Sequence, residues 1–153
     1  NKRQAMVLKR AEAHNIRTVF FEHKEFYVTG KVLRYLALYK IDFIVLAGFL
    51  WLVPENIIEQ YPSRIINIHP ALLPAYGGKG MYGAKVHQAV LDADEKESGA
   101  TVHYVTAGVD EGDIIMQGTF TIESEDQIED LQRKVAEVEK VILIEAIKKI
   151  SEA

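Results

Sequence analysis

The distribution of apolar and polar positions along the chain predicts alternating helices and strands. Apolar residues at helical spacing predict helices at residues 4–14, 31–40, 54–60, 83–93 and 124–149. Continuous or β-branched apolar runs predict strands at residues 16–21, 41–46, 65–68, 99–105 and 114–122. Two local signals refine these limits: Asn15 suits the left-handed end of the first helix, and Ser124 begins a capping box for the last one.

This alternation of helices and buried strands is typical of an α/β domain with a largely parallel sheet. The run Ile41–Leu46 is almost wholly apolar, as expected of a strand covered on both faces. The last two strands are separated by a short turn at residues 109–113, so we expect them to pair antiparallel at a sheet edge. Because no linker or repeat interrupts the pattern, we expect one domain over residues 1–153.

Composition narrows the class of protein. The net charge of -4 gives no basic surface for nucleic acid. The chain has no cysteine, which excludes disulfides, thiol nucleophiles and cysteine-bound zinc and agrees with a reducing, cytoplasmic location. No apolar run has the length of a membrane span, so we expect no membrane partner. The chain starts at Asn1 without a Met, and we expect a further segment upstream.

The most informative stretch for chemistry is residues 65–74, a buried strand that breaks at Pro70. Asn67 and His69 are two residues apart, so both side chains point to the same face of the strand. An amide donor beside an imidazole suits a carbonyl oxygen that becomes negative during a reaction. The alternative is a strand that ends in a polar loop, and for this stretch alone that interpretation is favoured.

A second apolar stretch is expected beside the first. In open α/β sheets, ligands bind outside the carboxyl ends of the strands. Gly48 and Phe49 follow one predicted strand, and the Asn67–His69 pair ends the next, so we expect them to be neighbours. The residues Trp51–Val53 could form an apolar wall for a flat heterocycle, or could be core residues beneath a loop. No metal site is expected, because His69, His87, His103 and Asp110 lack the spacing of metal ligands.

Several motifs together carry a family resemblance. Residues 44–50, 67–74, 99–105 and 109–117 resemble, in order and with compatible spacing, the folate-dependent formyltransferases. The resemblance covers nearly the whole chain and is strongest to the members that formylate glycinamide ribonucleotide in de novo purine biosynthesis. It implies an open, mostly parallel, Rossmann-like sheet with helices on both faces. It further implies a formyl transferase that uses 10-formyltetrahydrofolate as co-substrate. We expect no metal in the reaction, and the sequence leaves the oligomeric state open, with a homodimer as one option.

By this resemblance, Asn67, His69 and Asp110 match the catalytic trio of the family. The expected chemistry is attack of an amine on the formyl carbon, with a tetrahedral intermediate. Asn67 would donate a hydrogen bond to the developing oxyanion, and protonated His69 would supply the proton for the leaving nitrogen. Asp110 would stabilise the imidazolium or hold a water that accepts the amine proton. The alternative for Asp110 is a structural role, because residues 110–113 are a good turn sequence.

The resemblance also implies binding residues. For the folate they are Leu50, Trp51, Leu52, Val53, Ile58, Asn67, Val105, Thr106, Val109 and Asp110. For the ribonucleotide they are Gly48, Phe49, Pro70 and Glu139. The family also suggests a cis peptide bond between Leu73 and Pro74.

The main departure from the family lies at the start of the chain. The family's N-terminal strand and its glycine-rich phosphate loop are not found in this sequence, so we expect an N-terminally incomplete domain that binds the ribonucleotide poorly. Two other functions therefore stay open. One is formyltetrahydrofolate hydrolysis, in which water replaces the amine; the other is a catalytically impaired folate-binding remnant. A methionyl-tRNA formyltransferase is a weaker alternative, because the chain lacks a basic surface.

Overall fold

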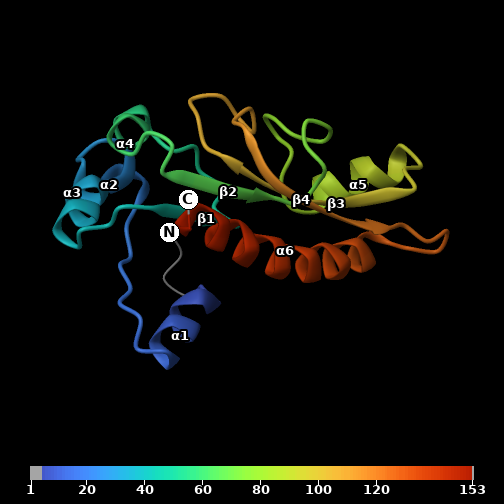
Figure 1. The fold of residues 1–153 in the computed structure, drawn as a ribbon, viewed down its shortest axis with the longest axis horizontal. Coiled ribbons are helices and arrows are strands. Elements are labelled where there is room, and N and C mark those ends of the chain that lie inside the picture. The colour runs from blue at the N-terminus through green and yellow to red at the C-terminus, as the bar shows by residue number, and fades with distance from the viewer. Residues whose placement is uncertain (1–4, 153) are drawn as a thin grey trace. The chain divides into compact units, whose positions relative to one another are not determined.

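The computed structural model describes residues 5–152, and the chain divides into two compact units, Asn1–Ile41 and Asp42–Ala153. The first unit contains three helices among its described residues (Figure 1): α1 (Met6–Ala13), α2 (His23–Tyr27) and α3 (Lys31–Leu38). Phe26 and Val32 are its buried apolar side chains. A capping box between Glu22 and Glu25 starts α2, and Glu25 also pairs with Lys31 at the start of α3.

Three predictions for the first unit can be compared with this structure. Asn15 adopts the left-handed conformation expected after α1, with φ of 55°. The strand predicted at residues 16–21 is wrong: this segment belongs to no strand, and Ile16 is 61% exposed. A β-branched and aromatic run has strand propensity, but propensity alone does not decide whether a segment forms a strand. The helix predicted at residues 31–40 is confirmed as α3, although its apolar Leu38 is 68% exposed at the helix end.

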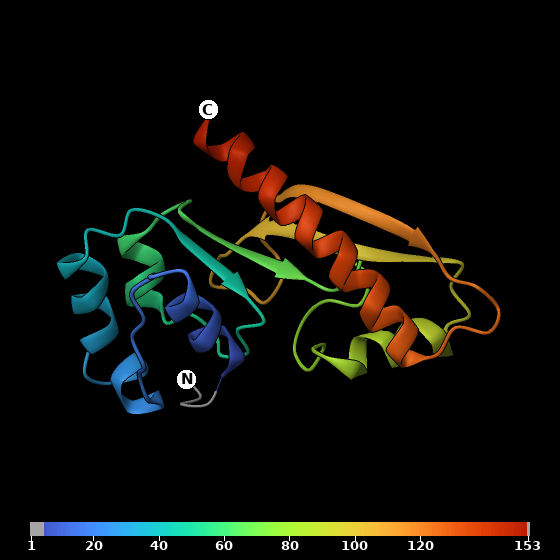
Figure 2. The ribbon, with the colours of Figure 1, turned by 90° about the horizontal axis from the view of Figure 1, so that it is seen from below.

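The second unit is built on a four-stranded sheet in the order β1-β2-β3-β4 (Figures 1 and 2). Its elements are β1 (Ile44–Ala47), α4 (Glu55–Gln60), β2 (Ile65–His69), α5 (Ala84–Asp92), β3 (Glu97–Tyr104), β4 (Ile114–Thr121) and α6 (Ile128–Ser151). The α/β class is confirmed, and so is the antiparallel pairing of β3 with β4. The mostly parallel sheet is wrong for the described strands, because β1 and β2 are parallel whereas β2 and β3 are antiparallel.

The direction of β3 explains this difference. After β2 the chain passes through a long loop and α5. Strand β3 then begins beside the carboxyl end of β2 and runs back along it, so that Thr101 pairs with His69 and His103 with Asn67. A buried apolar run predicts a strand but carries no information about its direction. The edge strand β1 starts at Ile44, later than predicted. It is also less buried than its apolar sequence predicts, since Val45 is 39% exposed.

One face of the sheet is apolar and is covered by α6, which Figure 2 shows lying along β3 and β4. Ile66, Ile68, Ala100 and Val102 pack here against Val135, Ile142 and Ala146 of the helix. Helix α6 begins at Ile128, four residues later than predicted, because Gln127 and Asp130 form the capping box assigned to Ser124. The helix lies very close to β4 at Gly118, where a Cβ atom would be 2.7 Å from Val138 and 2.8 Å from Ile142.

The opposite face of the same strands is polar and carries Asn67, His69, Thr101, His103 and Gln117. Over β3 and β4 this face is covered by the loop after β2, in place of the helix that was expected. The Thr101 hydroxyl donates to the carbonyl of Ala71 at 2.7 Å and accepts from the Leu73 backbone N–H at 3.0 Å. The Gln117 amide donates to the Leu73 carbonyl at 2.9 Å. This loop contains the expected cis bond between Leu73 and Pro74.

Candidate active site

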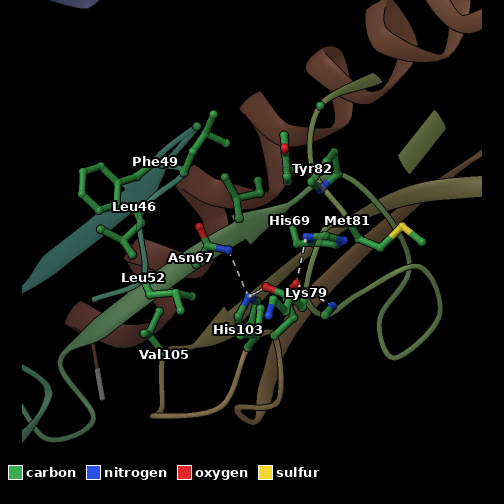
Figure 3. Close-up of a pocket in the computed structure, with 18 of the residues that line it drawn as sticks. Leu46, Phe49, Leu52, Asn67, His69, Lys79, Met81, Tyr82, His103 and Val105 are labelled. Carbon is green, nitrogen blue, oxygen red and sulfur yellow. Dashed lines mark hydrogen bonds and ion pairs between the residues drawn. The ribbon is translucent and has the colours of Figure 1, made fainter. Parts of the chain in front are cut away.

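A pocket of about 630 Å³ lies in the second unit at the carboxyl ends of β1 and β2 (Figure 3). Its walls come from the segments that follow these two strands, from residues 105–110 after β3, and from one side of α6. In Figure 3 the apolar side chains of Leu46, Phe49, Leu52 and Val105 lie on one side. Asn67, His69 and His103 converge beside them. The predicted neighbourhood of the β1 and β2 ends is therefore confirmed.

The amide of Asn67 is oriented by a buried histidine. The Nδ1–H group of His103 donates to the carbonyl of Tyr104 at 2.9 Å, and Nε2 of the same ring is 3.2 Å from Nδ2 of Asn67. Burial lowers the pKa of His103, which favours the neutral ring. Nε2 then accepts one hydrogen from the amide nitrogen of Asn67. The second hydrogen on that nitrogen is left for a ligand in the pocket.

His69 is held from two sides and is only 4% exposed. Its Nε2–H group donates to the backbone carbonyl of Tyr76 at 2.8 Å. A carbonyl oxygen only accepts hydrogen bonds and does not exchange protons with the ring. Its Nδ1 atom is 3.6 Å from Oδ2 of Asp110. The proton on Nδ1 is therefore the one that can be exchanged, and a carboxylate lies beside it.

Asp110 lies between the two histidines, His69 and His103. Its backbone is left-handed, with φ of 58°, and its Oδ2 atom accepts a hydrogen bond from the Gly78 N–H at 3.0 Å. Its Oδ1 atom is 3.6 Å from Nε2 of His103. A β-bulge between Val102 and His103 precedes the turn that carries Asp110. Residues 67, 69 and 110 are thus brought together, although 41 positions separate His69 from Asp110 (110 minus 69).

Most of the predicted binding residues line this pocket. The lining includes Leu50, Trp51, Leu52, Val53, Val105, Thr106 and Val109 of the predicted folate set, and Gly48, Phe49, Pro70 and Glu139 of the predicted ribonucleotide set. Leu50 and Leu52 are 64% and 62% exposed although they are apolar, which is typical of a wall that a ligand covers. Ile58 is not part of the lining; it lies in α4, and its predicted contact with the folate has no support from this geometry.

Glu139 approaches the pocket from α6. It lines the pocket together with Gln132 and Val135, at the spacing of one helix face. Burial raises the pKa of Glu139, which is unusual for a glutamate on a helix rich in charged residues. This residue is therefore partly shielded from solvent and lines the pocket.

Two histidines outside the predicted site residues, His103 and His87, also line the pocket. His87 is 3% exposed, its Nδ1 atom has no hydrogen-bond partner, and burial lowers its pKa, with His69 adding a smaller effect in the same direction. The alternation of Thr101 and His103 in β3 could have placed His103 on the same face as Asn67.

Residues 5–152 contain no group of three or more His, Cys, Asp or Glu residues that could hold a metal ion. None of the helices described between residues 5 and 152 is both long enough and apolar enough to cross a membrane.

The α/β sheet thus brings an amide, an imidazole and a carboxylate together at one end of an apolar-walled pocket, an arrangement whose chemistry suits acyl transfer. Residues 1–147 match the protein family described as formyl transferase, and the chain belongs to this family. The chain is 44% identical to the chloroplastic phosphoribosylglycinamide formyltransferase of Arabidopsis thaliana over 114 residues. The aligned region covers 74% of this chain and 39% of that protein. The chain is 35% identical over 143 residues to the phosphoribosylglycinamide formyltransferase of Bacillus subtilis, covering 91% of this chain and 71% of that protein.

Solved structures give the same family. Glycinamide ribonucleotide transformylase 1 from Symbiobacterium toebii matches with a TM-score of 0.88 and 34% identity, over 99% of this chain and 71% of that chain. A formyltetrahydrofolate deformylase from Pseudomonas syringae matches with a TM-score of 0.79 and 29% identity, over 92% of this chain and 47% of that chain. The predicted formyltransferase fold is confirmed. The chain spans less than half the length of its Arabidopsis relative.

Proposed function

We propose that the protein transfers the formyl group of 10-formyltetrahydrofolate to the amine of glycinamide ribonucleotide, in de novo purine biosynthesis. The observation that carries the proposal is the convergence of Asn67, His69 and Asp110 at one end of the apolar-walled pocket. Relatives named phosphoribosylglycinamide formyltransferase, at 44% and 35% identity, support the choice of substrates.

The first step is attack of the substrate amine on the formyl carbon. The formyl oxygen gains negative charge in the resulting tetrahedral intermediate. Asn67 donates to this oxygen through the amide hydrogen that His103 does not accept. Because His103 already fixes the amide, little reorganisation is needed as the charge develops, which is the condition for effective oxyanion stabilisation.

The second step is departure of the folate nitrogen, which needs a proton. His69 supplies it from Nδ1, since Nε2–H is committed to the Tyr76 carbonyl. Asp110 lies 3.6 Å from Nδ1 and stabilises the imidazolium form of His69 before the proton is transferred. The attacking amine, which has become an ammonium group, then returns a proton to His69 directly or through a water. The proton lost by the amine thus balances the proton gained by the leaving nitrogen.

Binding divides along the pocket. The apolar wall of Leu50–Val53 takes the flat pteridine ring of the folate, and residues 105–109 face it from the other side. Gly48, Phe49 and Pro70 take the ribonucleotide, and Glu139 accepts hydrogen bonds from ribose hydroxyls. A volume of about 630 Å³ agrees with a site for ligands of this size.

The test is loss of the formyl group from 10-formyltetrahydrofolate, measured with and without glycinamide ribonucleotide. We expect turnover that depends on the amine and yields formylated ribonucleotide in equal amount. Turnover without the amine would support formyltetrahydrofolate hydrolysis, which the similarity to the Pseudomonas syringae deformylase keeps as the second candidate. Folate binding without any turnover would support the binding remnant and contradict both enzymatic functions.

The remaining expectations belong to the same proposal. We infer one formyltransferase domain over residues 1–153, supported by a family match that runs through both compact units. A cytoplasmic location and the absence of nucleic-acid partners are supported by the net charge of -4 and the lack of cysteine. The absence of a metal in the reaction and the homodimer stay predictions.

A further inference from the structure

One short segment outside the predicted catalytic trio contacts two of its members. The carbonyl of Tyr76 accepts the hydrogen bond from Nε2–H of His69 at 2.8 Å. Two residues later, the backbone N–H of Gly78 donates to Oδ2 of Asp110 at 3.0 Å. We call residues 76–78 the bridge segment. His69 comes from β2 and Asp110 from the turn before β4, so this segment links two groups that are otherwise distant in sequence.

The bridge segment has an unusual backbone. Tyr76 has φ of 55° and Gly78 has φ of 89°, both in the left-handed region. A tyrosine adopts this region only when surrounding interactions hold it there. Gly77, between them, is closely packed, because a Cβ atom would be 2.5 Å from Cδ2 of Leu73 and would require the leucine side chain to move.

The interaction that holds Tyr76 lies away from the pocket. Its hydroxyl donates to Oε1 of Glu95 at 2.7 Å, and Glu95 belongs to the turn that follows α5. The ring of Tyr76 therefore reaches toward Glu95 while its carbonyl faces His69. Neither Tyr76 nor Glu95 lines the pocket of the candidate active site.

We propose that Tyr76 and Glu95 are positioning residues, which hold the bridge segment so that His69 keeps its proton on Nε2 and presents Nδ1 to Asp110. The Tyr76 carbonyl and the Asp110 carboxylate both accept, but the carbonyl is 2.8 Å from Nε2 whereas the carboxylate is 3.6 Å from Nδ1, so the shorter hydrogen bond keeps the proton of the neutral ring on Nε2. The Gly78 N–H fixes the carboxylate that faces Nδ1. The catalytic consequence rests on the proposed function, whereas the tautomer of His69 can be observed without any turnover.

The first test measures the tautomer of His69 by ¹⁵N NMR of histidine-labelled protein, together with steady-state kinetics. In the wild-type protein we expect the Nε2–H form. Tyr76→Phe removes only the hydroxyl and should raise the fraction of the Nδ1–H form. It should lower kcat by about three- to tenfold, as expected for loss of one charge-assisted hydrogen bond, with KM for both substrates changed less than about twofold.

Glu95 provides the matched variants. Glu95→Ala should reproduce both effects of Tyr76→Phe, whereas Glu95→Gln keeps an acceptor and should restore most of kcat. The double variant Tyr76→Phe/Glu95→Ala should be no worse than either single variant, because both remove the same bond. Tyr39→Phe in the first unit is the control for loss of a tyrosine hydroxyl remote from this bond.

A second test addresses the Gly78 end of the bridge segment. Gly78→Ala strains a residue with φ of 89° that donates to Asp110, whereas Gly80→Ala strains a residue with φ of 90° that does not. We expect a clearly larger loss of kcat for Gly78→Ala. Equal losses would contradict a specific role for the hydrogen bond to Asp110.

The outcomes separate the two proposals. An unchanged His69 tautomer in Tyr76→Phe would overturn the positioning role, whether kcat falls or not. A changed tautomer in a protein whose wild type does not transfer formyl groups would leave the positioning role intact and contradict the proposed function. Thermal unfolding of each variant should show that it remains folded at the assay temperature.

Discussion

The two faces of the sheet in the second unit are buried alike but are built for different purposes. Ile66, Ile68 and Val102 face α6 and form the apolar core. Their neighbours in the same strands, Asn67 and His103, face the opposite way and form part of the candidate active site. Alternation along β2 and β3 therefore separates stability from chemistry with a period of two residues.

The difference also concerns what covers each face. A 24-residue helix covers the apolar face, and its contacts are side chains packed on side chains. Loops cover the polar face, and their contacts are backbone groups that donate to Asp110 or accept from His69. Such groups hold positions without titrating. The comparison predicts that substitutions on the two faces affect different measurable quantities.

The largest effect is expected on the polar face. His69→Ala should lower kcat by about 10²- to 10⁴-fold, the usual contribution of a general acid, because its role lies in the transition state. The affinity for the folate, measured by direct titration, should be nearly unchanged. Equal losses in turnover and in folate affinity would contradict the assignment and blur the distinction between the faces.

The corresponding change on the apolar face should act on stability. Ile66 is fully buried, and Ile66→Ala should reduce the free energy of unfolding by about 2–5 kcal/mol, measured by urea denaturation. Ile66→Val should cost about 0.5–1.5 kcal/mol. The kcat of the folded fraction should stay within about twofold of the wild type. A loss of kcat comparable to that of His69→Ala would contradict the division between the faces.

A third effect links the polar site to stability through pH. Burial lowers the pKa of His87 and His103 in the folded chain. Below about pH 6.5 these histidines are therefore protonated to a greater extent in the unfolded chain than in the folded chain. The free energy of unfolding should therefore fall as the pH drops below this value, by at most about 1.4 kcal/mol per pH unit for each histidine. Calorimetry between pH 8 and pH 5 measures this slope.

Glu139 acts on stability in the opposite direction as the pH changes. Its raised pKa means that the folded chain keeps a proton to higher pH, so its contribution to stability is lost as the pH rises through that pKa. Glu139→Gln removes this contribution. In that background, His87→Gln should reduce the remaining slope; an unchanged slope would show that His87 does not titrate as its burial predicts.

The smallest effect is expected at the exposed apolar wall. Leu52→Ala should weaken folate binding by about three- to tenfold, since a ligand covers a side chain that is 62% exposed. The free energy of unfolding should change by less than about 0.5 kcal/mol. Leu38→Ala removes a leucine that is 68% exposed in the first unit and serves as the control, with no expected change in folate affinity.

The sequence predicted most of these elements because their patterns are local. Periodicity placed α4 and α5, and the spacing of Asn67 and His69 placed both on one face of β2. The partnership of Asp110 with His69 came from the family resemblance, since no local pattern joins positions so far apart. The strand predicted at residues 16–21 was wrong because strand propensity is only a weak local preference, which the folded context overrides.

The positions that the sequence could not reveal depend on backbone groups. No pattern of side chains shows that the Tyr76 carbonyl accepts from His69 or that the Gly78 N–H donates to Asp110. Every residue has these groups, so only their placement in space gives them a role. The late start of α6 has a similar cause, because Ser124 and Gln127 both begin plausible capping boxes and only the folded turn selects Gln127.

Gly118 shows how the packing of α6 limits the variation that this chain can accept. Its position in β4 tolerates no side chain, because Val138 and Ile142 occupy the space that a Cβ atom would need. A screen of all single substitutions scored by growth would therefore rank Gly118 beside His69, although Gly118 contacts no ligand site. Measuring the abundance of each variant would separate the two positions. Substitutions at Gly118 would lower the amount of folded protein in the cell, whereas His69→Ala would leave that amount unchanged and abolish the activity.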